Sequence, residues 1–237
     1  MATIDVRARV LGRAEPEAIR DLLLVALTFA SGAGDAVAFL GLDKVFSAFM
    51  TGNLVFLGLG VGGAGRPDGL RVASSLAAFA VGVFAAVRIV KPTKGTGVWP
   101  RRVSIALGVT ALAQLAFLGG WLATSGRPPT TAGDLLIAAS ALAFGLQSGA
   151  IMSLDVRGVF TTAATATVIM LASDEAGRSK SARERRRLAG VLLGLVAGAA
   201  AATFLLLHAR VYAAILPPAV TLAVVAIAAR TLDGVRG

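Results

Sequence analysis

Hydrophobic residues in this chain form eight long runs, separated by short stretches of charged residues, glycine and proline. A helix that crosses the hydrocarbon layer of a bilayer needs about 20 consecutive apolar residues. Six of the runs reach that length, whereas 158–173 is short and 45–63 is borderline and interrupted at Thr51-Gly52-Asn53. The eight runs cover residues 21–42, 45–63, 69–90, 102–124, 134–153, 158–173, 187–208 and 211–230.

The composition indicates that lipid surrounds these runs. Hydrophobic residues make up 56% and charged residues 15% of the 237 positions, and the mean hydropathy is +0.79. A soluble domain of this length keeps about a quarter of its residues charged. We therefore expect an all-α fold, a polytopic transmembrane helical bundle, in a single domain over 21–230.

The net charge of +10 would suggest a nucleic-acid partner for a soluble protein. Here the basic residues flank the apolar runs, and no basic stripe carries interleaved aromatic residues. Such positions set orientation and contact anionic lipid head groups. The expected partners are therefore the bilayer and its anionic head groups, with no nucleic acid.

Loop charge predicts how often the chain crosses. Residues 1–20 are polar and of mixed charge, unlike a signal peptide, and we expect them to form a cytoplasmic tail. Six crossings would place 18 of the 23 Lys and Arg residues on the cytoplasmic side, and eight crossings would place 15 there. The positive-inside rule favours six. In that arrangement 45–63 and 158–173 enter the membrane and return to the same side.

The two halves of the chain, about 21–124 and about 134–230, resemble each other. At one constant offset, Val-Phe at 45–46, Thr-Gly-Asn-Leu at 51–54 and Leu57 match Val-Phe at 159–160, Thr-Ala-Thr-Val at 165–168 and Leu171. Three crossings per half make an inverted 3+3 repeat with a broken or re-entrant segment in each half. Four crossings per half make a parallel 4+4 arrangement, the alternative. Many secondary transporters have the inverted form, with the site at the repeat interface.

Two motifs resemble the signature of a known family. Gly-Asp-Ala at 34–36 is followed by Phe-Ser-Ala-Phe-Met-Thr-Gly-Asn-Leu at 46–54, and the second half carries Gly-Leu-Gln-Ser at 145–148 and Phe-Thr-Thr at 160–162. The chain is similar over nearly its whole length to the YoaK-like bacterial inner-membrane proteins, a domain of uncharacterised function. The family pattern has Thr-Gly-Thr where this chain has Thr-Ala-Thr at 165–167, and Gln-Asn where it has Gln147-Ser148. The resemblance implies a multi-spanning protein of the bacterial cytoplasmic membrane and no known substrate.

Asp35 is the most informative single residue. It lies about fourteen positions into the first apolar run, on the order of 21 Å along a helix. An ionised carboxylate at mid-membrane costs about 2.5–3.5 kcal/mol on insertion scales. We expect Asp35 to be neutral, paired or facing a polar cavity. It is either an acid that couples a proton or cation, or a hydrogen-bonding residue that fixes the first helix to the next segment.

Other polar residues inside the runs complete the predicted substrate- or ion-binding set. Glycine lets a backbone bend, and neighbouring Thr and Asn side chains can satisfy the amide groups freed where a helix breaks. The alternative interpretation is helix packing through small residues with Asn as interhelical glue. Besides Asp35, the set contains Thr51, Gly52, Asn53, Gln147, Ser148, Thr165 and Thr167. Gln147 has several donors and acceptors to satisfy and should face the bundle interior.

The chain lacks the residues that several kinds of site and activity require. The chain has no cysteine and one histidine, His208, and it has no Gly-x-Ser-x-Gly motif, so we expect no enzyme, metal site or cofactor. Gly190, Gly194 and Gly198 line one face of the seventh run and predict close helix packing within the chain, with a homo-oligomer seam as the alternative.

The leading hypothesis is a transporter or permease of an unidentified small solute. The rival is a non-transporting membrane component, such as an assembly or stress-response partner.

Overall fold

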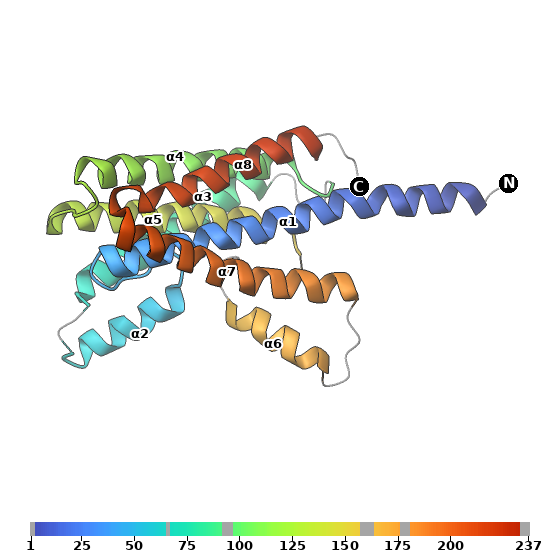
Figure 1. Cartoon of the computed structure of the whole chain (residues 1–237). Coiled ribbons are helices and arrows are strands. Elements are labelled where there is room, and N and C mark those ends of the chain that lie inside the picture. Colours follow the sequence, from blue (N-terminus) through green and yellow to red (C-terminus); the bar gives the residue numbers. More distant parts are fainter. Residues whose placement is uncertain (1–2, 65–66, 92–96, 157–163, 176–180, 233–237) are drawn as a thin grey trace.

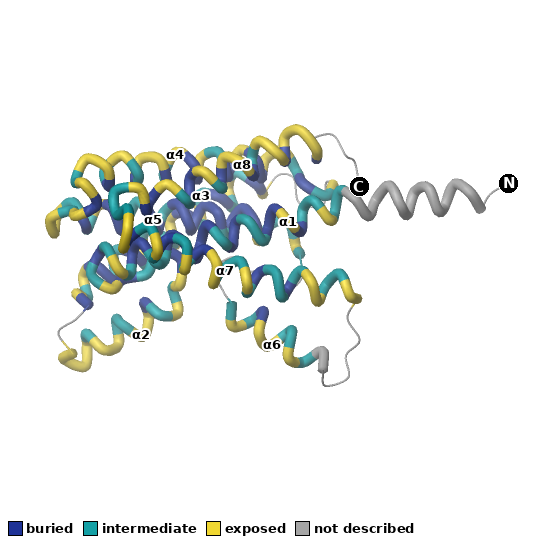
Figure 2. Tube along the Cα trace, in the orientation of Figure 1, coloured by how far each residue is buried: buried dark blue, intermediate teal, exposed yellow. Residues whose placement is uncertain are grey.

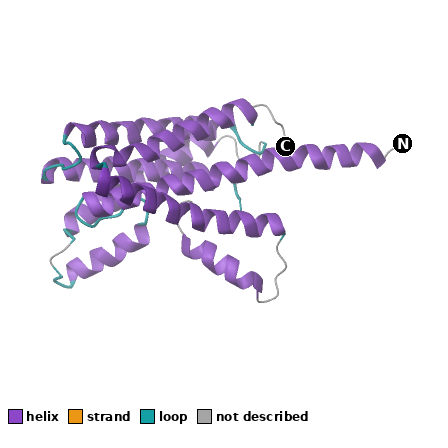
Figure 3. Ribbon diagram, viewed as in Figure 1, coloured by secondary structure: helices purple, strands orange, loops and turns teal. Residues whose placement is uncertain are grey.

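The computed structural model describes residues 3–64, 67–91, 97–156, 164–175 and 181–232. Within those ranges the chain is helical and contains no strand (Figure 3). The second-half residues 157–163, which include the Phe-Thr-Thr motif at 160–162, lie outside the described part. The helices in chain order are α1 Thr3–Gly41, α2 Met50–Val61, α3 Gly69–Val90, α4 Arg101–Ala123, α5 Thr130–Met152, α6 Ala164–Glu175, α7 Ala182–His208, the 3-10 turn η2 Arg210–Ile215, and α8 Leu216–Thr231.

Six of the described helices are long and apolar enough to cross a membrane: α1 from Pro16, α3, α4, α5, α7, and η2 with α8. By contrast, α2 and α6 have 12 residues each, or about 18 Å of helix, which is well short of the roughly 30 Å hydrocarbon layer. The predicted all-α transmembrane bundle is thus confirmed. In Figure 1, α2 and α6 lie outside the layer of long helices, on the same side of it.

The apolar core shows where the long helices begin and end. Leu42 after α1 and Val72 at the start of α3 belong to one buried cluster, so the chain leaves α1 and enters α3 at the same end of the bundle. Ile151 at the end of α5 and Val191 near the start of α7 belong to a second cluster at the opposite end. Neither α2 nor α6 therefore carries the chain across, and the long helices make six passages.

Two helix pairs form the closest contacts, and each pair combines distant parts of the chain. In the pair α1–α7, a Cβ on Gly198 would lie against the carbonyl oxygen of Phe29. In the pair α3–α5, a Cβ on Gly82 would lie against the carbonyl oxygen of Leu142. Glycine allows backbones to approach this closely because it has no side chain. The predicted packing of the glycine face of α7 inside the chain is confirmed.

Exposed positions lie where the long helices face away from one another (Figure 2), and large apolar side chains occupy many of them. Leu112 on α4, Leu193 on α7 and Leu207 on α7 are 67%, 70% and 76% exposed. Water would penalise such a surface, whereas lipid tails match it. The exposure pattern therefore agrees with a protein that sits in a bilayer.

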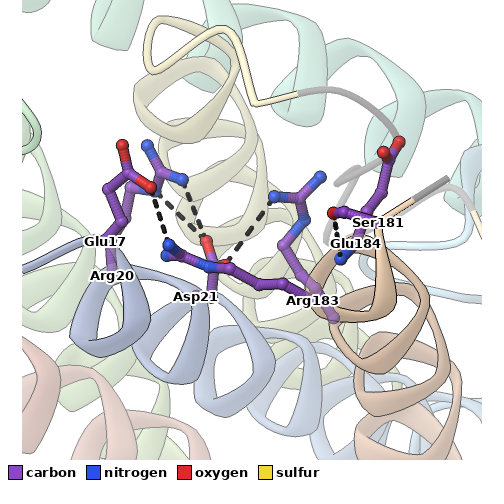
Figure 4. Close-up of polar contacts among 7 residues, drawn as sticks. Glu17, Arg20, Asp21, Ser181, Arg183 and Glu184 are labelled. Carbon is purple, nitrogen blue, oxygen red and sulfur yellow. Dashed lines mark hydrogen bonds and ion pairs between the residues drawn. The ribbon is translucent and has the colours of Figure 1, made fainter. Parts of the chain in front are cut away.

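Ion pairs hold α1 to α7 at the end of the bundle that carries Asp21, which we call the Asp21 face. Asp21 accepts a hydrogen bond of 3.0 Å from Arg183 Nε on α7 and lies 3.7 Å from Arg187 Nη1 (Figure 4). Arg20 donates to Asp21 at 3.0 Å from the same helix, and Arg183 also donates to Glu17 at 2.7 Å. Helix α1 is continuous from Thr3, so residues 3–20 of the expected polar tail form the first part of the first long helix.

A second set of ion pairs holds α3 to α5 at the opposite end, the Arg71 face. Arg71 is only 7% exposed, and its Nε lies 2.5 Å from an Asp134 oxygen on α5. Its other nitrogens donate to the backbone carbonyl of Thr130 at 3.2 Å and lie 3.8 Å from Asp43. Because these donors have carboxylate and carbonyl partners, the guanidinium can lie inside the bundle end at tolerable cost.

Gly198→Ala should destabilise the protein by roughly 1–3 kcal/mol, because the added methyl group must push α7 away from the backbone of α1. The matched control is Gly108→Ala on α4, where nothing lies within 4 Å of the added carbon, so better helix propensity should leave stability unchanged or slightly raised. Thermal unfolding in detergent measures both variants. Equal melting temperatures for the two would contradict the close contact.

Candidate functional site

The chain between α1 and α2 is a non-helical segment, residues 42–49, and Asp35 on α1 binds its backbone. The Oδ1 atom of Asp35 accepts hydrogen bonds from the backbone amides of Ser47 at 2.8 Å and Ala48 at 2.7 Å. Asp35 lies six residues before the end of α1, which is about 9 Å inside the bundle. The segment thus turns back along α1 to the level of Asp35, and the Asp35 carboxylate gives two of its backbone amides a protein partner.

Asn53 holds the same segment from the other side. Its side chain accepts from the Phe46 amide at 3.0 Å and donates to the Phe46 carbonyl at 2.7 Å. Ser75 on α3 adds a bond of 2.8 Å to that carbonyl. The predicted break at Thr51-Gly52-Asn53 is therefore wrong in position, because these residues form the first turn of α2 and the break precedes them. Asn53 does satisfy the freed backbone groups, as predicted, and is completely buried.

Three phenylalanine rings surround this break. Phe39 stacks on Phe46 with ring centroids 4.8 Å apart, and Phe46 meets the edge of Phe49 at 5.2 Å. A side chain at Gly52 would collide with these rings, since its Cβ would lie 2.6 Å from Phe49. Gly52 is needed here for space beside the aromatic rings.

A groove of about 460 Å³ lies between α1, the 42–49 segment, α6 and α7. Thr165 from α6 lines it together with Asp35, so residues from the first and second halves of the chain meet there. The described lining residues are Gly32, Asp35, Ala36, Phe39, Leu40, Phe46, Phe49, Ala164, Thr165, Leu195, Ala199 and Thr203. Asp35 is the one ionisable residue among them.

The other predicted residues do not line this groove. Gln147 on α5 is buried, as expected, and donates to the Leu27 carbonyl at 3.2 Å and to Ser31 Oγ at 2.9 Å, so it ties α5 to α1 one turn before Asp35. Ser148 bonds back to the Phe144 carbonyl of its own helix at 2.7 Å. Thr167 is fully buried and Thr51 is exposed on the outer side of α2. These hydrogen bonds indicate that Gln147 and Ser148 serve in helix packing.

Sequence reasoning missed the aromatic residues of the groove. Phe46 and Phe49 stand inside the quoted motif at 46–54, and Phe39 follows Asp35 by one helical turn. That i to i+4 spacing was the available signal, because it places Phe39 and Asp35 on one face of α1. Phenylalanine is frequent in lipid-facing runs, so the spacing alone could not separate a groove from a lipid-facing surface.

A second cavity opens at the Arg71 face. It has a volume of about 630 Å³ and lies between the end of α1, the end of α2 and the starts of α3 and α5. Gly60 of α2 and Gly41 of α1 both line it, which confirms that α2 returns to the end of the bundle where α1 stops. Arg71, Asp43 and Asp68 make its walls polar.

Comparison with known proteins places the chain in a family. The family described as "Protein of unknown function (DUF1275)" matches residues 23–228, a range that includes the groove and all or most of each of the six long helices. The chain belongs to this family. It is also 31% identical over 161 residues to the UPF0700 transmembrane protein YoaK of Bacillus subtilis (strain 168), which covers 68% of this chain and 69% of that relative.

Membership of the DUF1275 family agrees with the predicted resemblance and with a multi-pass membrane protein. No solved structure gives a significant match. Among the described residues no three His, Cys, Asp or Glu side chains lie together in a way that could hold a metal ion. The groove at Asp35 is therefore the feature on which a functional proposal for this DUF1275 member can rest.

Asn53→Ala should loosen the 42–49 segment, because it removes the acceptor of the Phe46 amide and leaves that group unsatisfied, at a cost of roughly 1–3 kcal/mol. The chain has no cysteine, so Ala48→Cys provides a unique probe at a position that is 1% exposed. We expect an aqueous maleimide to label this cysteine faster in the Asn53→Ala background. Thr51→Ala, on the same turn but exposed, is the control and should leave the rate unchanged.

Proposed function

We propose that this protein is a transporter or permease of a small solute, with its binding site in the groove at Asp35. The observation that carries the proposal is an acidic side chain inside a membrane-spanning helix, at a re-entrant break, lining a groove that both halves of the chain build. Intramembrane acids mark ion and substrate pathways by default, and broken helices near the repeat interface form transporter sites.

An inverted repeat is part of this proposal, and the contacts of the helix pairs support it. Asp21 and Asp134 are separated by the same number of residues as Gly32 and Gly145, and both acids lie near the start of an apolar span. Arg71 and Arg187 are separated by the same number of residues along the chain as Gly82 and Gly198. The ion pair Arg71–Asp134 at one face thus corresponds to the contact of Arg187 with Asp21 at the other face.

The same correspondence extends to the close helix contacts. A Cβ on Gly145 would meet the Phe79 carbonyl, and a Cβ on Gly32 would meet the Leu195 carbonyl, which holds the corresponding position in the second half. The first helix of each proposed repeat therefore packs against a helix of the other repeat: α1 packs with α7, and α5 packs with α3. Rocking of the α1–α7 pair, which carries the groove, against the α3–α5 pair is the movement we propose for alternating access.

A non-transporting membrane component, such as an assembly or stress-response partner, is the second candidate. Its supporting observation is that Asp35 and Asn53 both bind the backbone of the 42–49 segment, which is a structural task. In this alternative the groove has no solute, and the polar residues serve only to hold the break together.

The remaining properties are part of the same proposal. The protein lies in the bacterial cytoplasmic membrane with its N-terminus in the cytoplasm, since that orientation places most Lys and Arg residues inside. Its partners are lipid, anionic head groups and the solute, with a homo-oligomer as a further state and no nucleic acid. We propose no enzymatic activity and no cofactor.

Asp35→Asn should abolish pH-dependent uptake while the fold is kept, because an amide oxygen can still accept from Ser47 and Ala48 but cannot carry the charge. Asp35→Ala should also lower stability by roughly 1–3 kcal/mol per unsatisfied amide. The solute for uptake into proteoliposomes is chosen by a thermal-shift screen of metabolites on the purified protein. Asp155→Asn, at an exposed acid after α5, is the control. Unchanged uptake in Asp35→Asn at every pH would favour the second candidate.

Epitope tags inserted in the 62–70 and 91–101 loops test the orientation. With a cytoplasmic N-terminus and a re-entrant α2, the first tag should be accessible only from the periplasmic side and the second only from the cytoplasm. Protease accessibility in spheroplasts and in inverted vesicles measures both. A cytoplasmic 62–70 tag would show that the proposed orientation is reversed.

A further inference from the structure

We infer that the groove takes an organic cation with apolar substituents, such as a hydrophobic amine or a quaternary ammonium or phosphonium ion. This inference rests on the proposed function only for the location of the site. Of the residues that line the groove, Asp35 is ionisable, and it is acidic. A single negative group in a region of low dielectric attracts a cation and repels an anion.

The aromatic lining favours the same ligand charge. The rings of Phe39, Phe46 and Phe49 all line the groove beside Asp35. Ring faces carry partial negative charge and attract ammonium groups. Lys44 already makes such a contact with one of these rings, with its Nζ atom 4.7 Å from the centre of the Phe39 ring.

The scarcity of polar groups restricts the rest of the ligand. Apart from Asp35, the lining side chains that can form hydrogen bonds are Thr165 and Thr203. A sugar or another highly hydroxylated solute would leave many of its groups unpaired there, at a cost for each one. Apolar substituents, by contrast, match the aliphatic and aromatic walls, and about 460 Å³ is a usual size for a small-molecule pocket.

The two amides just before α2 that face Asp35 do not supply an anion site. A helix N-terminus attracts anions through its unpaired amides. Here the amides of Ser47 and Ala48, just before α2, already donate to Asp35. An anionic ligand would therefore be repelled by the Asp35 carboxylate. It could not bind the amides of Ser47 and Ala48, because both already donate to that carboxylate.

Tetraphenylphosphonium and tetraphenylborate provide a matched test, because they have nearly the same size and shape and opposite charge. Equilibrium dialysis of both ions against the purified protein in detergent, at mildly alkaline pH, measures binding. We expect saturable binding of the phosphonium and none of the borate. Asp35→Asn should weaken phosphonium binding by roughly tenfold or more, and Asp155→Asn should not change it.

A second variant keeps the test valid if Asp35→Asn does not fold. Thr165 is exposed in the groove and makes no contact that holds the 42–49 segment, so Thr165→Arg should preserve the fold. Its guanidinium should abolish phosphonium binding by repulsion. Lys44→Met should instead strengthen binding, because it removes an ammonium that already occupies the face of Phe39.

The outcomes separate this inference from the proposed function. Equal binding of both ions, or phosphonium binding unaffected by Asp35→Asn and Thr165→Arg, would overturn the cation site. Uptake of phosphonium by proteoliposomes is measured separately. Saturable, Asp35-dependent binding without uptake would support the cation site and contradict transport of this probe. Uptake of an anionic solute through the groove would support transport and overturn the ligand class.

Discussion

A break in a membrane helix can exist only where the freed backbone groups find partners inside the protein. In this chain two side chains supply those partners. Asp35 accepts the amides of Ser47 and Ala48, and Asn53 pairs with both backbone groups of Phe46. Because these bonds are available about 9 Å inside the end of α1, the chain can turn back within the membrane and begin α2 there. The groove exists because of this turn.

The long helices provide the rigid frame around the break. Close backbone contact through glycine joins α1 to α7 and α3 to α5, and an ion pair secures each of these helix pairs at opposite faces of the bundle. Lipid offers no hydrophobic force that would drive helices together, so close packing and polar contacts must supply the association. The short helices α2 and α6 lie beside this frame; the first residues of α6 and the segment that precedes α2 line the groove.

The candidate site could be predicted in part. Asp35 and Asn53 stand out in the sequence because ionisable and amide side chains are costly within apolar runs. Their partners could not be predicted, since the bonds of Asp35 reach 12 and 13 residues ahead and depend on the path of an irregular segment. Gln147 was placed correctly in the interior, yet its contact with Leu27 and Ser31 spans most of the first half of the protein. The aromatic walls of the groove could not be predicted, because phenylalanine is also frequent on the lipid-facing side of membrane helices.

The sequence by itself determined the surrounding medium, the helical class, the six long helices and the close-packing face of α7. These properties follow from length, composition and periodicity, which act over a few turns of one helix. Only the tertiary structure decided that α2 turns back from the level of Asp35, that α1 pairs with α7 and α5 with α3, and that residues of both halves share one groove. Those features depend on contacts between residues far apart in the chain, and the hydrophobic pattern of a helix does not specify which neighbour it will meet.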